Sequence, residues 1–358
     1  MLSKPLMINQ PPDLADLQYQ DEILNGVSRT FALTIPQLPG ALRQVIGNAY
    51  LLCRITDTIE DDNALTSEQT RQLSDMFSEV VCGSLSAETF AEALYPLLSD
   101  HTIPAEHDLI KNTPSVIRVT HSFNPVQRKA LERCVRIMSR GMADFQDNET
   151  LDGLKDLPGM NLYCYYVAGV VGEMLTELFC DYSEAINRNK PELMKLAVSF
   201  GQGLQMTNIL KDIWDDRKRG ACWLPQDIFL AHQFILRDLR PDYSDKRFEE
   251  GLANLIGIAA KHLENALTYT CMIPPQEKGI RKFCLWALGM AILTLQKINH
   301  HRHFKDGAQV KISRRTVKAT IITTSLFASN NWMLRQLFRM ASRNLPETTI
   351  SDELFLKR

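Results

Sequence analysis

Two acidic segments hold the side chains whose types and spacing best suit chemistry. The first places Asp57 and Asp61 four residues apart. The second places Asn208, Asp212 and Asp216 at the same interval. Residues at that interval share one face of a helix, where like charges repel each other. Both segments follow strongly apolar stretches, so their carboxylates would be costly to bury without a compensating cation.

The donor atoms indicate which cation would bind. All candidate ligands are oxygens, and the sequence contains neither the ExxH pattern of di-iron bundles nor the HExxH pattern of zinc hydrolases. Oxygen-only sites suit Mg²⁺, which is usually shared with substrate phosphates. One such motif alone is more often a solvated acidic helix end. Two of them, each beside basic residues, favour a magnesium site.

Basic and hydroxyl side chains accompany both acidic segments. They are Ser28, Arg29, Thr30 and Arg54 near the first, and Lys211 within the second. Cations that hold phosphate oxygens opposite acids that hold Mg²⁺ would clamp a diphosphate. We therefore expect both segments to grip one magnesium–diphosphate, which then departs as a leaving group. A non-catalytic helical scaffold would have no use for this arrangement.

The elements that must position these residues read as helices. Apolar residues recur at three- and four-residue steps in eight segments. These segments are 41–59, 68–81, 127–146, 162–178, 191–214, 246–269, 281–298 and 316–341. Strand-like alternation is scarce, and no linker is long enough to split the chain. We expect an all-α, single-domain helical bundle over 21–345, with an N-terminal arm at 1–20 and a tail at 346–358.

Charge and cysteine content exclude some protein classes. Among the 358 residues, 40 lysines and arginines oppose 42 acidic residues, whereas a protein that coats nucleic acid carries a positive excess. The eight cysteines form no CxxC pair, which indicates reduced thiols in a cytoplasmic protein. No signal peptide is evident. The longest uncharged runs fall short of the roughly 20 apolar residues that a membrane-spanning helix needs.

Five stretches resemble the squalene/phytoene synthase family, in that family's order. They are 28–33, 50–62, 141–145, 163–169 and 205–227. The resemblance implies an all-α isoprenoid-synthase fold with a central apolar cavity. It also implies head-to-head condensation of two farnesyl diphosphates to presqualene diphosphate, then reduction by NADPH to squalene. An allylic cation must form away from water, which agrees with a dry apolar cavity.

The resemblance also assigns roles to single residues. The Mg²⁺ ligands would be Asp57, Glu60, Asp61, Asp212 and Asp216. The substrate would be bound by Ser28, Arg29, Thr30, Arg54, Gln205, Asn208 and Lys211. Tyr163 matches the tyrosine proposed to handle the proton lost when the cyclopropane closes. NADPH contacts would come from Arg29, Arg54, Lys211, Phe283, Lys311 and Arg314.

Two branches of the family remain open. A phytoene or dehydrosqualene synthase shares the acids and the first half-reaction but needs no NADPH. The stretches 141–145, 281–284 and 299–314 resemble the squalene-forming branch, although Arg281 stands where many of its members carry phenylalanine. The stretches 218–220 and 224–227 also resemble the phytoene branch.

The segment 326–343 is amphipathic and basic. It suits either a terminal helix packed on the bundle or a helix that lies on a membrane surface. Because squalene must leave into lipid, we expect peripheral membrane contact through this segment.

Overall fold

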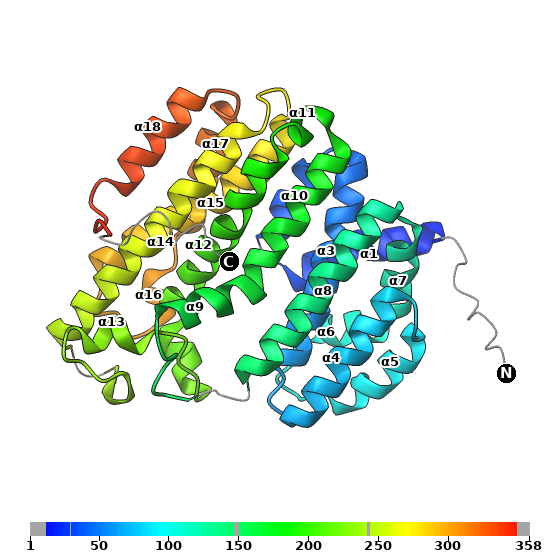
Figure 1. Cartoon of the computed structure of the whole chain (residues 1–358), viewed down its shortest axis with the longest axis horizontal. Helices are drawn as coiled ribbons and strands as arrows, with labels where there is room; N and C mark the ends of the chain where they lie inside the picture. The colour runs from blue at the N-terminus through cyan, green and yellow to red at the C-terminus, as the bar shows by residue number, and fades with distance from the viewer. Residues whose placement is uncertain (1–11, 29, 147–149, 242–243, 349–358) are drawn as a thin grey trace. The chain divides into compact units, whose positions relative to one another are not determined.

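The computed structural model describes residues 12–28, 30–146, 150–241 and 244–348 and is helical (Figure 1). No β-strand occurs in these ranges, where one isolated bridge joins Leu154 to Pro225. The predicted all-α class is confirmed. The chain clusters into two compact units, one formed by 1–147 with 177–184 and the other by 148–176 with 185–358.

The first unit is built around the helix that carries the first acidic motif. Its helices are α1 (Leu14–Val27), α2 (Phe31–Thr34), α3 (Gly40–Asp61), α4 (Ser67–Cys82), α5 (Ala87–Leu94), α6 (Pro104–Lys111), α7 (Thr113–Ser122) and α8 (Pro125–Gln146). Helix α3 packs against α1, α4, α6, α7 and α8. Leu51, Ile55 and Ile59, four residues apart, are fully buried on one face of α3. This apolar face fixes the rotation of α3 and thereby the direction of its carboxylates.

Helix α1 begins inside the stretch that we expected to be an arm. Asp13 and Asp16 form a capping box at its start. Arg118 of α7 donates hydrogen bonds of 2.8 and 2.6 Å to the two carboxylate oxygens of Asp16 and lowers the pKa of this buried acid. Because Asp16 and Arg118 are 102 residues apart, no local pattern shows that this segment is anchored.

The second unit carries the second acidic motif on its longest helix. Its helices are α9 (Leu157–Cys164), α10 (Val170–Tyr182, which ends in the first unit), α11 (Glu184–Asn187), α12 (Lys190–Lys218), α13 (Gln226–Leu230), α14 (Lys246–Met272), α15 (Lys278–His300), α16 (Gly307–Val310), α17 (Arg314–Leu326) and α18 (Asn331–Ser342). Helix α12 packs along α14 and also contacts α9, α15 and α16. The one helix that we expected over 316–341 is two helices, because Asn330 caps a new helix after α17 ends.

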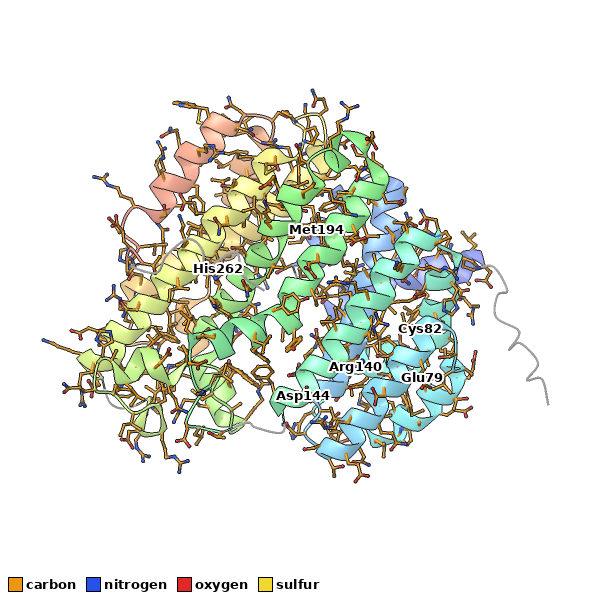
Figure 2. All side chains as sticks on the ribbon, in the orientation of Figure 1. Glu79, Cys82, Arg140, Asp144, Met194 and His262 are labelled. Atoms are coloured by element: carbon orange, nitrogen blue, oxygen red, sulfur yellow. The ribbon has the colours of Figure 1, made fainter. Side chains whose placement is uncertain are left out.

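Helix α12 is held to its neighbours at close range. His262 of α14, labelled in Figure 2, is hydrogen-bonded to Ser199 of α12 at 2.8 Å. Burial lowers the pKa of His262 to about 3, so its ring is neutral at physiological pH. A Cβ atom at Gly201 would lie 2.1 Å from the carbonyl oxygen of Ala168. Glycine at 201 therefore allows α12 to approach the segment between α9 and α10.

That segment, Tyr165–Gly169, forms a π-helix. Such turns are rare and occur frequently at functional sites. It begins two residues after Tyr163 and lies against α12. The π-helix therefore lies between Tyr163 and α12, the helix that carries the second acidic motif.

Candidate active site

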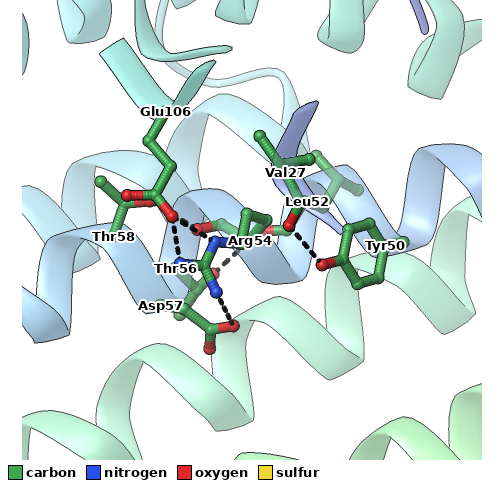
Figure 3. Close-up of polar contacts among 8 residues, drawn as sticks. All are labelled: Val27, Tyr50, Leu52, Arg54, Thr56, Asp57, Thr58 and Glu106. Carbon is green, nitrogen blue, oxygen red and sulfur yellow. Dashed lines mark hydrogen bonds and ion pairs between the residues drawn. The ribbon is translucent and has the colours of Figure 1, made fainter. Parts of the chain in front are cut away.

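The first acidic motif lies on the last two turns of α3 (Figure 3). The Asp57 side chain keeps 29% of its surface exposed, and its Oδ2 lies 3.8 Å from Nη1 of Arg54. Burial raises the pKa of Asp57 to about 7; the positive charge of Arg54 opposes this, whereas the negative charges of Asp61 and Glu106 add to it. The site therefore favours a second positive charge beside Asp57.

Arg54 is held by an acid that the sequence motifs do not contain. Glu106 of α6 accepts a hydrogen bond of 2.8 Å from Nε of Arg54 and a second, shorter one from its Nη2 (Figure 3). Both go to the same oxygen, Oε1 of Glu106. Burial alone would lower the pKa of Arg54, but the charges of Asp57 and Glu106 raise it, so Arg54 remains a cation.

Other predicted residues of the first unit gather around Tyr50. Its hydroxyl donates to the carbonyl oxygen of Val27 at 2.9 Å (Figure 3). Burial raises the pKa of Tyr50, and a hydrogen bond with Ser28 and the charge of Arg54 partly offset this rise. Ser28 also accepts a hydrogen bond from the backbone N–H of Phe31. The structure thus brings Ser28, Arg54 and Asp57 around Tyr50, which lies in the stretch 50–62 that we matched to the family but to which we assigned no role.

The remaining predicted residues of this unit lie as follows. Thr30 is half-buried at the position before α2, while Glu60 and Asp61 form the last turn of α3, where Glu60 is half-buried and Asp61 is exposed. Arg29 lies outside the described residues.

The acid that follows α3 has a structural role. Buried Asp62 accepts hydrogen bonds from Thr102 at 2.6 Å and from the backbone N–H groups of Ser99 and Ala64. Burial opposes the charged form, but these hydrogen bonds outweigh it and lower the pKa of Asp62. In the stretch 141–145, Asp144, labelled in Figure 2, pairs with Arg71 of α4 at 3.1 Å. That ion pair is largely exposed and joins α8 to α4.

The second acidic motif occupies the last turns of α12. Nζ of Lys211 lies 3.3 Å from Oδ1 of Asn208 and 3.1 Å from Oδ2 of Asp212. Buried Asp216 accepts a hydrogen bond of 2.5 Å from Arg219. A basic side chain therefore accompanies each carboxylate of this motif. Gln205, two turns earlier on α12, is half-buried.

A loop distant in sequence lies against this motif. The indole N–H of Trp214 donates to the carbonyl oxygen of Phe304 at 2.6 Å. A Cβ atom at Gly307 would lie 3.0 Å from the carbonyl oxygen of Lys211 and 3.6 Å from Oδ1 of Asp212. Glycine at 307 therefore leaves room beside Asp212. We did not predict this contact, because Phe304 and Trp214 are 90 residues apart.

Tyr163 is buried and held by stacking. Its ring lies parallel to that of Trp223, with centroids 4.1 Å apart and an interplanar angle of 3°. The loop that carries Trp223 is fixed by backbone hydrogen bonds between Leu154 and Leu224 and between Gln226 and Leu154. Trp223 belongs to a stretch that we matched to the family, but its contact with Tyr163 was not evident from the sequence.

The residues predicted to contact NADPH lie on several elements. Phe283 is buried in α15, whereas Lys311 and Arg314 are exposed between α16 and the first turn of α17. Nζ of Lys297 donates to the carbonyl oxygen of Lys311 at 2.5 Å, which adds a third cation to this group.

Arg281, which departs from the family pattern, is fully buried. Its guanidinium donates to the carbonyl oxygens of Ile273 and Ala328 at 2.7 and 2.5 Å, and to Asn331. Burial lowers the pKa of Arg281. This side chain therefore secures the turn between α17 and α18.

The donor chemistry of the two motifs fits Mg²⁺. Within the described ranges, no three His, Cys, Asp or Glu side chains gather in a group that could hold a metal. Mg²⁺ usually binds through one or two carboxylates and completes its shell with water and substrate phosphates. Each motif supplies two such carboxylates, Asp57 and Asp61 in the first and Asp212 and Asp216 in the second.

Comparisons with known proteins agree with this chemistry. The family model described as squalene/phytoene synthase matches residues 24–316. Squalene synthase ERG9 of Gibberella zeae is 31% identical over 285 residues, which cover 79% of this chain and 59% of that protein. Squalene synthase ERG9 of Saccharomyces cerevisiae is 29% identical over 297 residues, 82% of this chain and 64% of that protein. The chain thus spans about three fifths of the length of these relatives.

The fold also agrees with that of a solved structure. A solved complex of TcSQS with the ligand BPH1237 matches with a TM-score of 0.74 and 22% identity, over 96% of this chain and 95% of that one. At this identity the match establishes the shared isoprenoid-synthase fold. Since the family model covers most of the sequence, the chain belongs to the squalene/phytoene synthase family.

Proposed function

We propose that this protein is a squalene synthase, a magnesium-dependent prenyltransferase. It condenses two farnesyl diphosphates head to head to presqualene diphosphate and reduces this to squalene with NADPH. The observation that carries the proposal is the pairing of acids and bases on α3 and α12, where Arg54 lies 3.8 Å from Asp57 and Lys211 lies 3.1 Å from Asp212. The similarity to squalene synthases favours this product over dehydrosqualene or phytoene.

The chain's residues divide the work of releasing diphosphate. Bound Mg²⁺ neutralises the negative charge that develops on the leaving group. The residues that would hold Mg²⁺ are Asp57, Glu60 and Asp61 of the first motif and Asp212 and Asp216 of the second. The side chains that would donate hydrogen bonds to diphosphate oxygens are Ser28, Arg29, Thr30, Arg54, Gln205, Asn208 and Lys211. The side chains of Arg54 and Lys211 keep 27% and 25% of their surface exposed, so both can reach a ligand.

Tyr163 would act as a phenolate, whose oxygen takes up the proton lost from carbon as the cyclopropane closes and so becomes a neutral hydroxyl. The stacked ring of Trp223 fixes the direction of that oxygen. General acid–base catalysis needs such a group within hydrogen-bond reach of the reacting carbon. A fixed ring therefore favours proton transfer over escape of the cation.

NADPH supplies hydride for the second half-reaction. Lys311 and Arg314, with Lys297 beside them, offer cations to its phosphates. By the family resemblance, Arg29, Arg54 and Lys211 would also contact NADPH, and Phe283 would provide an apolar contact.

The product distinguishes the two branches of the family. We expect protein incubated with farnesyl diphosphate, Mg²⁺ and NADPH to yield squalene by mass analysis. Without NADPH we expect presqualene diphosphate to accumulate. A C30 or C40 carotenoid precursor formed equally with and without NADPH would contradict this assignment and establish the dehydrosqualene or phytoene alternative.

We further propose peripheral contact with a lipid surface through α17 and α18. No helix in the described residues is long and apolar enough to cross a bilayer. Leu334 packs inward, whereas Ile322, Leu326, Trp332 and Met340 are 65–74% exposed. Three basic side chains of the same region are also exposed, namely Arg335, Arg339 and Arg343. Apolar side chains beside basic ones suit an anionic membrane surface.

We expect the protein to sediment with anionic liposomes and much less with neutral ones. The double variant Leu326→Ser/Trp332→Ser should lose at least tenfold in partitioning, because two exposed apolar side chains no longer enter the interface. Ile235→Ser is the matched control, since Ile235 is 56% exposed elsewhere in the second unit. Equally weak sedimentation of all three proteins would refute the membrane contact.

A further inference from the structure

Glu106 stands outside both acidic motifs, yet it makes the shortest contacts of Arg54. Its carboxylate accepts two of the guanidinium's N–H groups, while Asp57 lies 3.8 Å from the remaining arm of that group (Figure 3). Glu106 is also the most buried of the three side chains, with 9% of its side-chain surface exposed. Because Glu106 is buried, water does not easily compete with it for the Arg54 guanidinium.

The position of Glu106 is fixed by the packing of α6. A Cβ atom at Gly26 of α1 would lie 2.9 Å from the Cβ of Ala105, so glycine allows the two helices to approach at this point. Glu106 occupies the first turn of α6, where backbone N–H groups stabilise a carboxylate. The packing of α6 on α1 therefore fixes the position of the Glu106 carboxylate, and the first acidic motif on α3 does not.

Arg54 has two acids within reach and is bonded to only one. A separation of 3.8 Å between Nη1 of Arg54 and Oδ2 of Asp57 allows attraction but is too long for a hydrogen bond. The two residues lie three apart on one helix, a spacing at which such side chains can join directly. A direct pair would occupy the oxygens of Asp57 that a metal ion needs.

We propose that Glu106 is a positioning residue that holds the Arg54 guanidinium away from Asp57. This leaves the Asp57 oxygens open to a divalent cation and leaves Nη1 of Arg54 open to a phosphate oxygen. The proposal rests on the proposed function only in naming Mg²⁺ and diphosphate as those ligands.

Cation binding without substrate tests the proposal directly. Mn²⁺ serves as a paramagnetic probe, with its free concentration followed by electron paramagnetic resonance in an Asp212→Asn background that leaves the first motif intact. We expect Glu106→Gln to raise the Kd for Mn²⁺ about tenfold, because the released Arg54 pairs with Asp57. Glu92→Gln, at an exposed position of the same unit, should leave the Kd unchanged.

Two further variants separate positioning from the simple loss of a negative charge. In an Arg54→Met background, Glu106→Gln should change the Kd less than threefold, since no guanidinium remains to be released. Glu106→Asp keeps the charge but shortens the reach, and it should still weaken Mn²⁺ binding severalfold. An equal loss with and without Arg54, or full affinity in Glu106→Asp, would overturn the proposal.

The kinetic consequence has its own signature. In the otherwise wild-type enzyme, Glu106→Gln should raise the KM for Mg²⁺ more than it lowers kcat, and excess Mg²⁺ should restore most of the rate. Thermal melting identifies any variant that fails to fold, and Glu106→Asp then carries the test. If the effect of Glu106 on the Kd for Mn²⁺ depends on Arg54 but the protein makes no squalene, only the proposed function is refuted. Squalene formation without that dependence would refute only the role of Glu106.

Discussion

We expect Asp57→Asn and Asp212→Asn each to abolish the formation of presqualene diphosphate. We expect the rate to fall at least about 10³-fold, or roughly 4 kcal/mol of transition-state stabilisation. Asparagine has nearly the same shape as aspartate but carries no charge, so the loss isolates the charged ligand. Radiolabelled farnesyl diphosphate turned over at saturating Mg²⁺ measures the effect.

The fold should survive both substitutions. Burial raises the pKa of Asp57 to about 7, so between pH 4 and 7 the folded protein holds a proton that the unfolded chain has released. Stability contributed by that proton is lost as the pH rises through 7. At pH 8 the neutral asparagine should therefore melt at the same temperature as wild type or higher. Asp212 is one-third exposed, and its replacement should change the melting temperature little.

Asp215→Asn is the matched control for the second motif. Asp215 lies on the same helix and pairs with Lys218 at 3.0 Å, outside the proposed ligand set. We expect its variant to keep more than half of wild-type activity. Normal turnover by Asp57→Asn or Asp212→Asn would remove that acid from the metal site, whereas equal losses in Asp215→Asn would point to a general effect of charge.

Tyr163→Phe should block the first half-reaction and spare the second. Phenylalanine retains the ring that stacks on Trp223 at 4.1 Å, so only the hydroxyl is lost. Removing a general acid–base group typically costs about 10²- to 10⁴-fold in rate. We therefore expect presqualene diphosphate formation to fall by that factor. Squalene formation from supplied presqualene diphosphate and NADPH should stay near the wild-type rate.

Stopped assays from both starting substrates measure the two steps separately. Tyr182→Phe, at an exposed tyrosine, controls for loss of a hydroxyl away from the site. Undiminished presqualene diphosphate output by Tyr163→Phe would exclude its hydroxyl as the proton acceptor. Equal losses in both half-reactions would instead assign Tyr163 to the shape of the site.

The sequence by itself determined the two acidic motifs and the helices that carry them, α3 and α12. Their signals are local: apolar residues such as Leu51, Ile55 and Ile59 recur at the helical interval, and Asp57 and Asp61 repeat at the same interval. Helical geometry then requires the carboxylates to share a face. The break between α17 and α18 was missed because the apolar pattern continues across the cap at Asn330.

Tertiary structure alone decided which partners each motif has. Glu106 holds Arg54 from a helix 52 residues away, and Trp223 stacks on Tyr163 from a loop 60 residues beyond it. Arg281 looked like a departure from the family, and only its buried contacts with three carbonyl and amide oxygens revealed its structural role. Such contacts depend on how helices pack, and neither spacing nor periodicity along one helix contains that information.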